Sequence, residues 1–231
     1  MDEKKYNLEQ SIAVLGKLLD LSAKETDKAS CEALAEKAKI IYERHPESED
    51  TALGYAITLL ILSTKETELK KRMATAKKLE KLQQKFPDSQ NIALQYARIL
   101  VNLSIKQTRL KEIEGTAKKL EKLQQKFQDS QDIAEAFARI LVNLSTEQAK
   151  LKEREATAKK LEKLQQKFPD SQDVALPYTR ILFILSTKQT GLKEIEGTAK
   201  KLEKLQQKFQ ESQDIALPYA MILVNLSAEQ T

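Results

Sequence analysis

Residues 77–86 read KKLEKLQQKF, and the same ten letters return at 118–127, 159–168 and 200–209, so that successive copies start 41 residues apart. A period between about 20 and 50 residues is typical of arrays in which each unit buries its apolar face against its neighbours. One serine also recurs at the same phase, so the register covers nearly the whole chain: Ser22, Ser63, Ser104, Ser145, Ser186 and Ser227.

The composition selects the fold class. The chain has 231 residues, of which 41% are hydrophobic and 32% charged, with only five Gly and five Pro. Such a chain is too apolar to be disordered and has too few turn residues for an all-β fold. Strong helix formers dominate it. We therefore expect an all-α protein.

Charge, cysteine content and apolar runs indicate the compartment. The 39 basic and 34 acidic residues leave a net charge of +5, as expected for a salt-bridged helical surface. Cys31 is the single cysteine, and no secretory signal is visible at the start. The longest apolar run, at 56–62, is far shorter than the roughly 20 residues that span a bilayer. We expect a cytoplasmic protein that does not insert into membranes.

Each unit resolves into two helices. In 91–104 the apolar side chains recur at spacings of three and four, which predicts a shorter helix. Each serine then opens a Ser-x-x-Gln or Ser-x-x-Glu sequence, which fits a capping box and predicts that a longer helix begins there. The longer helix carries one apolar stripe: Leu69, Ala76, Leu79, Leu82 and Phe86.

The repeated decapeptide is predicted to be the middle of the longer helix. Leu79, Leu82 and Phe86 are expected to be buried, and the polar residues, Gln83 included, mainly solvated. Gly115 and Gly197 fall inside this helix, where glycine costs about 1 kcal/mol relative to alanine, and predict a kink or a close helix contact.

The expected architecture is an α-solenoid of antiparallel helix pairs with about eleven helices, six shorter alternating with five longer. We assign 1–231 to one repeat domain. A helix at 7–22 precedes units near 23–63, 64–104, 105–145, 146–186 and 187–227.

Two stretches carry a family resemblance. Ala35, Ala38, Tyr42 and Pro46 are followed by Leu53, Gly54 and Tyr55, and Phe86, Pro87, Leu94 and Tyr96 repeat the pattern. This order resembles the tetratricopeptide repeat over about residues 7–227, although the signature tryptophan is absent and the period is 41, where the family has 34. Seven extra residues are nearly two helical turns, which keeps an apolar face in phase. HEAT or armadillo stacking, with periods near 40, is the alternative.

The resemblance implies a right-handed superhelix whose shorter helices line a concave, peptide-binding face. The free stripe of each shorter helix, at i, i+4 and i+8, supplies the candidate residues. In successive units these are Leu94, Arg98 and Asn102; Glu135, Arg139 and Asn143; Leu176, Arg180 and Ile184; and Leu217, Met221 and Asn225. Arginine matches carboxylates and asparagine can hold a peptide backbone, so an acidic or extended peptide fits. Alternatively, the three arginines only solubilise the helix or pair with neighbouring Glu residues.

A second candidate surface is a lysine ridge formed by Lys77, Lys78, Lys81 and Lys85 and their equivalents, which predicts affinity for phosphates. Interleaved Glu80 and the absence of a visible aromatic platform make a solvated face the stronger expectation, and nucleic acid an unlikely partner.

Catalysis and metal binding have little support in the sequence. One histidine, His45, and one cysteine, Cys31, do not make a typical zinc site, and no Gly-rich phosphate loop is present. His45 fits a capping or surface role, and Cys31 a packing role. We expect no cofactor and no metal.

The last shorter helix has no following helix in the sequence to cover its apolar residues, among them Ile215, Tyr219, Ile222, Leu223 and Leu226. This predicts an end-to-end contact with a second copy. The expected function is a non-catalytic protein-interaction scaffold. A nucleic-acid-binding array and a purely self-associating structural array remain as alternatives.

Overall fold

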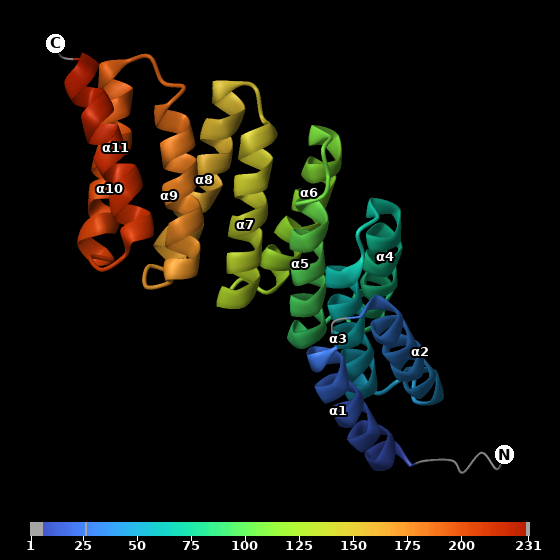
Figure 1. The fold of residues 1–231 in the computed structure, drawn as a ribbon. Helices are drawn as coiled ribbons and strands as arrows, with labels where there is room; N and C mark the ends of the chain where they lie inside the picture. The colour runs from blue at the N-terminus through green and yellow to red at the C-terminus, as the bar shows by residue number, and fades with distance from the viewer. Residues whose placement is uncertain (1–6, 26, 230–231) are drawn as a thin grey trace. The chain divides into compact units, whose positions relative to one another are not determined.

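The computed structural model describes residues 7–25 and 27–229, and within these residues every regular element is an α-helix. Figure 1 shows the helices succeeding one another as a repeated hairpin. The helices are α1 (Leu8–Lys24), α2 (Lys28–Arg44), α3 (Glu49–Lys65), α4 (Leu69–Lys85), α5 (Gln90–Ser104), α6 (Leu110–Lys126), α7 (Gln131–Glu147), α8 (Leu151–Lys167), α9 (Gln172–Ser186), α10 (Leu192–Lys208) and α11 (Gln213–Glu229). The all-α repeat predicted from the 41-residue period is confirmed, with the predicted number of helices.

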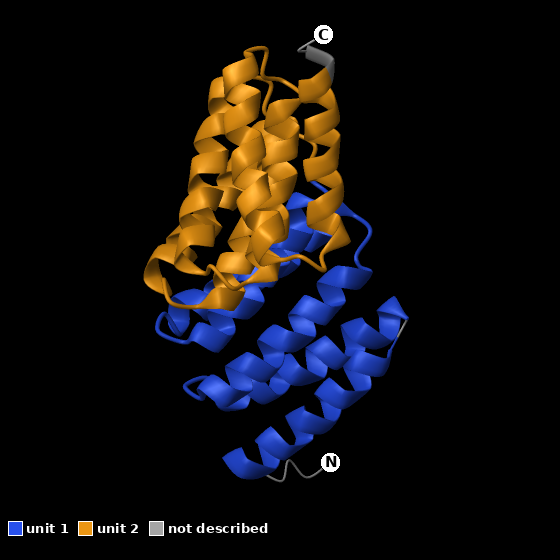
Figure 2. Ribbon diagram, turned by 90° about the vertical axis from the view of Figure 1, so that its left-hand side faces the viewer, with its two compact units in different colours: residues 1–107 blue, residues 108–231 orange. Residues whose placement is uncertain are grey.

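The chain divides into two compact units, residues 1–107 and residues 108–231, which Figure 2 shows in blue and orange. Unit 1 holds α1 to α5 and unit 2 holds α6 to α11. Within each unit an odd-numbered helix packs against the next odd-numbered helix, as α3 does on α5 and α7 on α9. It also packs against the even-numbered helices on either side of it in the same unit.

The even-numbered helices are further from one another. In the described part of each unit, no Cα atom of one even helix lies within 8 Å of a Cα atom of another. Each unit therefore has two layers, and the odd helices form the more closely spaced one. In a curved two-layer array, the layer with the smaller spacing lies on the inside of the curve.

The predicted alternation of shorter and longer helices is wrong. All the helices have 17 residues except α5 and α9, which have 15. The error arises because the recurring serine lies near the end of each odd helix and not at the start of the even helix. Ser63 donates its hydroxyl hydrogen to Leu60 O at 2.6 Å, and Ser104 donates to Val101 O at 2.8 Å. The even helix begins only several residues later, at Leu69 and at Leu110.

The residue three positions after the serine is likewise not part of a capping box. In three of the 41-residue repeats its side chain accepts a hydrogen bond from a threonine on the next even helix: Thr75 to Glu66 at 2.8 Å, Thr157 to Gln148 at 3.0 Å and Thr198 to Gln189 at 2.9 Å. The serines that do cap helices stand at the other corner of each repeat, where an even helix is followed by an odd one. Ser48, Ser89 and Ser171 accept hydrogen bonds from the backbone N–H three residues on.

The core follows the predicted apolar stripes. Leu79, Leu120, Leu161 and Leu202, one from each decapeptide, are fully buried, and Leu82 is buried beside Leu79, whereas Phe86 is only half-buried. On the odd helices Tyr96, Phe137 and Tyr178 are buried as expected, while Tyr219 is half-buried.

Gln83 corrects the assignment of the decapeptide's polar residues to solvent. It is buried, and its amide donates to Pro87 O at 3.1 Å. The equivalent glutamines do the same at 3.0 to 3.2 Å: Gln124 to Gln128 O, Gln165 to Pro169 O and Gln206 to Gln210 O. Helices end with backbone carbonyls that have no partner within the helix. This glutamine therefore fixes the corner after each even helix with or without proline.

The glycines inside α6 and α10 are also not explained by a close contact. A Cβ atom built at Gly115 or Gly197 would meet nothing within 4 Å, and both positions are exposed in unbroken helices. Gly54 differs, because a Cβ there would come within 3.1 Å of Leu15 of α1. Within the described residues no helix is long and apolar enough to cross a bilayer.

Candidate functional site

The first candidate surface is the solvent-facing stripe of the odd helices. The middle of α5 is buried on every side except along Leu94, Arg98 and Asn102, and the same three positions face solvent or are half-buried on α7, α9 and α11. We call these residues the open stripe: Leu94, Arg98, Asn102, Glu135, Arg139, Asn143, Leu176, Arg180, Ile184, Leu217, Met221 and Asn225. The first three belong to unit 1 and the other nine to unit 2.

In unit 2 the open stripe runs across three helices that pack side by side. Arg139 and Arg180, on the adjacent helices α7 and α9, are both exposed. Arg139 Nη2 lies 3.5 Å from Asp173 Oδ1 at the start of α9, a contact between two exposed side chains. Arg180 has no carboxylate partner among the described residues. The alternative of arginines paired with neighbouring acids is thus met at Arg139, with an aspartate and not a glutamate.

Glu135 serves the packing of the array as well as lying on the stripe. Its Oε1 accepts a hydrogen bond from Ser171 Oγ at 3.2 Å, and that serine is the N-cap of α9. In unit 1 Ser89, the N-cap of α5, makes a corresponding bond of 2.6 Å to Glu49 of α3. A glutamate of one odd helix thus contacts the start of the next in both units.

Sequence reasoning left out the equivalent residues of α3. Leu53, Ile57 and Ile61 stand 41 residues before Leu94, Arg98 and Asn102, and all three are half-buried. Because α3 packs beside α5, an apolar row adjoins Arg98 and Asn102 in unit 1. The 41-residue register would have found these residues.

The lysine ridge is partly neutralised by carboxylates of the neighbouring repeat. Lys160 of α8 pairs with Glu121 of α6 at 2.7 Å, and Lys201 of α10 pairs with Glu162 of α8 at 2.8 Å. In three of the four decapeptides a second lysine reaches the preceding corner, at 2.8 to 2.9 Å: Lys85 to Glu47, Lys167 to Asp129 and Lys208 to Asp170. Successive copies of the decapeptide in unit 2 thus supply both partners of a repeated inter-repeat ion pair.

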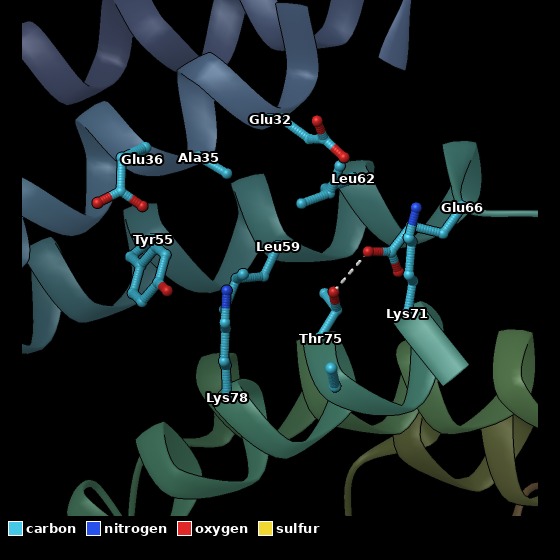
Figure 3. A pocket seen from close by; sticks show the side chains of 11 residues that line it. Glu32, Ala35, Glu36, Tyr55, Leu59, Leu62, Glu66, Lys71, Thr75 and Lys78 are labelled. Atoms are coloured by element: carbon cyan, nitrogen blue, oxygen red, sulfur yellow. Dashed lines mark hydrogen bonds between the residues drawn. The ribbon is translucent and has the colours of Figure 1, made fainter. Parts of the chain in front are cut away.

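The second candidate site is a pocket of about 290 Å³ in unit 1, between α2 and α4 and against α3 (Figure 3). Ala35, Tyr55, Leu59 and Leu62 form its apolar wall. Its charged lining residues come from α2, from α4 and from the residue that follows α3: Glu32, Glu36, Glu66, Lys71 and Lys78.

Glu66 is the least exposed charged residue of this pocket, with 5% of its surface accessible. One carboxylate oxygen accepts the bond from Thr75, whereas the other, Oε2, is buried and has no hydrogen-bond partner within the described residues. Burial raises the pKa of the Glu66 carboxyl above its ordinary value, although the Thr75 bond and the charges of Lys28, Arg72 and Lys78 act in the opposite direction. An ionised Glu66 is therefore short of one donor.

Arg72 supports the same corner through backbone oxygens. Its guanidinium is buried and donates to Glu66 O and, at 2.8 Å, to Asn102 O on α5. In unit 2 the equivalent Arg154 donates to Gln148 O. The arginine therefore fixes the chain that leads into the even helix and does not form an ion pair with the Glu66 carboxylate.

The last helix exposes a face that is covered elsewhere. Leu223 is 44% exposed, whereas the equivalent Leu59, Leu100, Leu141 and Leu182 are at most 2% exposed. Leu217, Met221 and Val224 are exposed as well. Of the apolar residues named for this helix in the sequence, Ile215, Ile222 and Leu226 are buried. They face the preceding helices, so the exposed face lies on the other sides of α11.

The two residues considered for catalysis have structural contacts. His45 is the C-terminal cap residue of α2, and its Nε2 lies 3.0 Å from the Ser11 hydroxyl oxygen on α1. Cys31 is buried against Ala35 and Leu62, and burial raises the pKa of its thiol. Its packing role is confirmed.

The comparisons with known proteins assign no family. No model of a known protein family matches the chain, and a search of curated proteins gives no match either.

Proposed function

We propose that the protein is a non-catalytic, tetratricopeptide-like scaffold that binds an extended, acidic peptide along the open stripe. The observation that supports this most is the pattern of burial on the odd helices. On α5, α7 and α9 the open stripe carries an arginine at the same position, Arg98, Arg139 and Arg180, and all three are exposed.

The chemistry of the stripe suits a carboxylate-bearing, extended chain. A guanidinium presents a planar set of donors that matches a carboxylate, and a hydrogen bond to a charged group contributes about 1.5–3 kcal/mol. Half-buried Leu94 and Leu176 flank the arginines and offer apolar contact to alternate side chains. The closer spacing of the odd helices puts this stripe on the inside of each unit's curve, where a ligand touches several repeats.

For the compartment we propose the cytoplasm, since the single cysteine is buried and unpaired.

The test is a binding titration with acidic peptides that have either a free or an amidated C-terminus. The triple variant Arg98→Ala, Arg139→Ala, Arg180→Ala should weaken binding at least tenfold. A matched triple variant, Lys81→Ala, Lys122→Ala, Lys163→Ala, removes the same charge from exposed positions on even helices and should change little. Circular dichroism should show that both variants are folded.

Asp173→Asn supplies a gain-of-function arm, because it removes the carboxylate that now lies beside Arg139. Acidic peptides should bind this variant more tightly. Equal binding by the wild type and the arginine variant would reject the open stripe as the site. A loss of binding confined to the lysine variant would favour the lysine ridge as the binding surface.

Self-association through α11 is a second candidate, supported by the exposure of Leu223 at a position that is buried in the four preceding odd helices. The occupant would be α11 of a second copy, an apolar face that matches its own. Sedimentation should show a concentration-dependent dimer that is lost in Leu223→Glu, while Leu100→Glu, which places a charge in the core, should unfold the chain. A strictly monomeric wild type at high concentration would reject this contact.

A further inference from the structure

The pocket between α2 and α4 lies where a repeated ion pair is missing. In unit 2, a decapeptide glutamate of one even helix pairs with a lysine of the next, as Glu121 does with Lys160. Lys78 of α4 is the equivalent of Lys160, but the position equivalent to Glu121 on α2 is Lys39. Lys39 pairs with Glu36 and Glu43 on its own helix. No carboxylate of α2 therefore bridges the gap to Lys78.

Two groups of opposite charge in the same pocket are left without an ion-pair partner within the described residues. Lys78 has no ion pair within the described residues, and Glu66 Oε2 is buried without a donor. The other three charged lining residues are already paired: Glu32 with Lys28, Glu36 with Lys39 and Lys71 with Glu68.

Lys78 and Glu66 are close but do not touch. Lys78 stands three residues after Thr75, which holds Glu66, so the two positions on α4 are about 4.5 Å apart along the helix axis. The charge of Lys78 acts on Glu66, yet the pair does not reach ion-pair distance. Figure 3 shows Lys78 and Thr75 rising from the same helix toward Leu59 and Glu66. The space between the two charges fits a small molecule.

The unpaired charges select the ligand class. An anion alone would satisfy Lys78 but face the Glu66 carboxylate, and a cation alone would satisfy Glu66 but face Lys78. A molecule with both charges satisfies both, and its carbon chain would contact Leu59 and Leu62. A volume of about 290 Å³ is at the lower end of the range for ligand pockets, which limits the ligand to a small one.

We propose that this pocket binds a small zwitterion of the amino-acid class, with its ammonium group on Glu66 Oε2 and its carboxylate on Lys78. None of the lining residues belongs to the open stripe, so the proposal does not depend on peptide binding there.

The experiment is a titration followed by amide NMR shifts and calorimetry, with glycine, β-alanine, γ-aminobutyrate and ε-aminocaproate as probes. Butylamine and butyrate each carry only one of the two charges. At least one zwitterion should bind, with shifts centred on α2, α3 and α4, and at least tenfold more tightly than either single-charge analogue. Binding of butylamine or butyrate as tight as that of the best zwitterion, or no binding by any probe, would overturn the proposal.

Three variants assign the two ends of the ligand. Glu66→Gln introduces the residue that the later units carry here and retains an acceptor for Thr75, so it should remain folded. Lys78→Met changes an exposed residue. Each should weaken zwitterion binding at least tenfold, whereas Lys77→Met, an exposed neighbour that does not line the pocket, should not. Unchanged affinity in the Glu66 or Lys78 variant would reject the assigned contact.

A fourth variant supplies the missing ion pair. Glu36→Lys combined with Lys39→Glu gives α2 the charge order of the decapeptide without changing its net charge. The new carboxylate at position 39 should compete for Lys78 and weaken zwitterion binding at least tenfold, with the thermal midpoint retained. Full affinity in this folded variant would show that Lys78 does not hold the ligand.

Discussion

The gap between α2 and α4 in unit 1 and the gap between α8 and α10 in unit 2 have the same place in the repeat but different chemistry. Across the second gap Glu162 pairs with Lys201. Across the first, Lys39 stands at the position equivalent to Glu162 and pairs within its own helix. Glu66 stands where unit 2 has glutamine, Gln148 before α8 and Gln189 before α10. Yet the apolar residue behind the first gap, Leu59 on α3, has a buried equivalent on α9, Leu182. The apolar core sets the repeat, and the polar contacts across the even helices can be changed without changing it.

The largest expected effect tests whether equivalent core positions contribute equally to stability in the two units. Leu79→Ala in unit 1 and Leu161→Ala in unit 2 each remove a fully buried side chain at the same repeat position. Each should lower the free energy of unfolding by about 2–5 kcal/mol through lost transfer energy and a residual cavity. Urea denaturation measures both, with exposed Lys81→Ala as control. A negligible loss at one site would show that the equivalence of the two units fails in the core.

The next largest effect is expected from exchanging the residue that differs between the corner after α3, Glu66, and the corner after α7, Gln148. Glu66→Gln should raise the free energy of unfolding by about 1 kcal/mol at neutral pH, because a desolvated carboxylate becomes a neutral amide. Gln148→Glu should lower it by about 2 kcal/mol, since it buries a carboxylate beside Thr157. The same urea titration checks both. Effects of the same sign would contradict our account of Glu66.

The stabilisation by Glu66→Gln should depend on pH. The folded-state pKa of Glu66 is raised, so the folded protein binds its proton more tightly than the unfolded chain does. This contribution to stability is fully present below the ordinary glutamate pKa of about 4.3 and is lost as the pH rises through the raised pKa. The advantage of the variant should therefore shrink as neutral samples are acidified through that pKa. The charged groups facing the carboxyl are Lys28, Glu32 and Glu36 from α2 and Lys71, Arg72 and Lys78 from α4. An advantage independent of pH would exclude ionisation as its cause.

A smaller effect on stability is expected at the position where α6 and α10 have glycine and α4 and α8 have alanine. Gly115→Ala and Gly197→Ala should each stabilise the chain by about 0.5–1 kcal/mol, because alanine lowers the entropy of the unfolded chain and meets no neighbour here. Ala74→Gly and Ala156→Gly should cost a similar amount in α4 and α8. Thermal unfolding measures all four. Gly54→Ala is the contrasting case, since its Cβ would press on Leu15. A loss of stability at Gly115 would reveal a constraint on that glycine.

The smallest effect is that of the inter-repeat ion pair. Glu162→Gln should lower the free energy of unfolding by no more than about 0.2–1 kcal/mol, and less at high salt, because the pair with Lys201 is partly exposed to solvent. Lys39→Gln in unit 1 breaks only pairs within α2 and should cost no more. Denaturation at low and high salt checks this. A large, salt-independent loss at Glu162 would mean that the ion pair sets the stacking.

The sequence predicted the repeat more reliably than the corners. Spacing of apolar residues at three and four fixes which side of a helix is buried, so Leu79 and Tyr96 were placed correctly. The serine signal was misread because Ser-x-x-Gln is compatible with a helix start, while the same serine can donate its hydroxyl to a carbonyl one turn back at a helix end, as Ser104 does. Local letters do not distinguish these two cases.

The sequence by itself determined the 41-residue register, the all-α class and the free stripe of the odd helices, because these depend on periodicity along the chain. Only the tertiary structure decided that Gln83 closes a corner, that Gly115 has free space around it and that Glu66 and Lys78 line one pocket. Each of these depends on distances between side chains that meet through folding, and on how much water is left around them. A buried carboxylate oxygen without a donor results from the surroundings of the residue, so it cannot be predicted from a glutamate at position 66 alone.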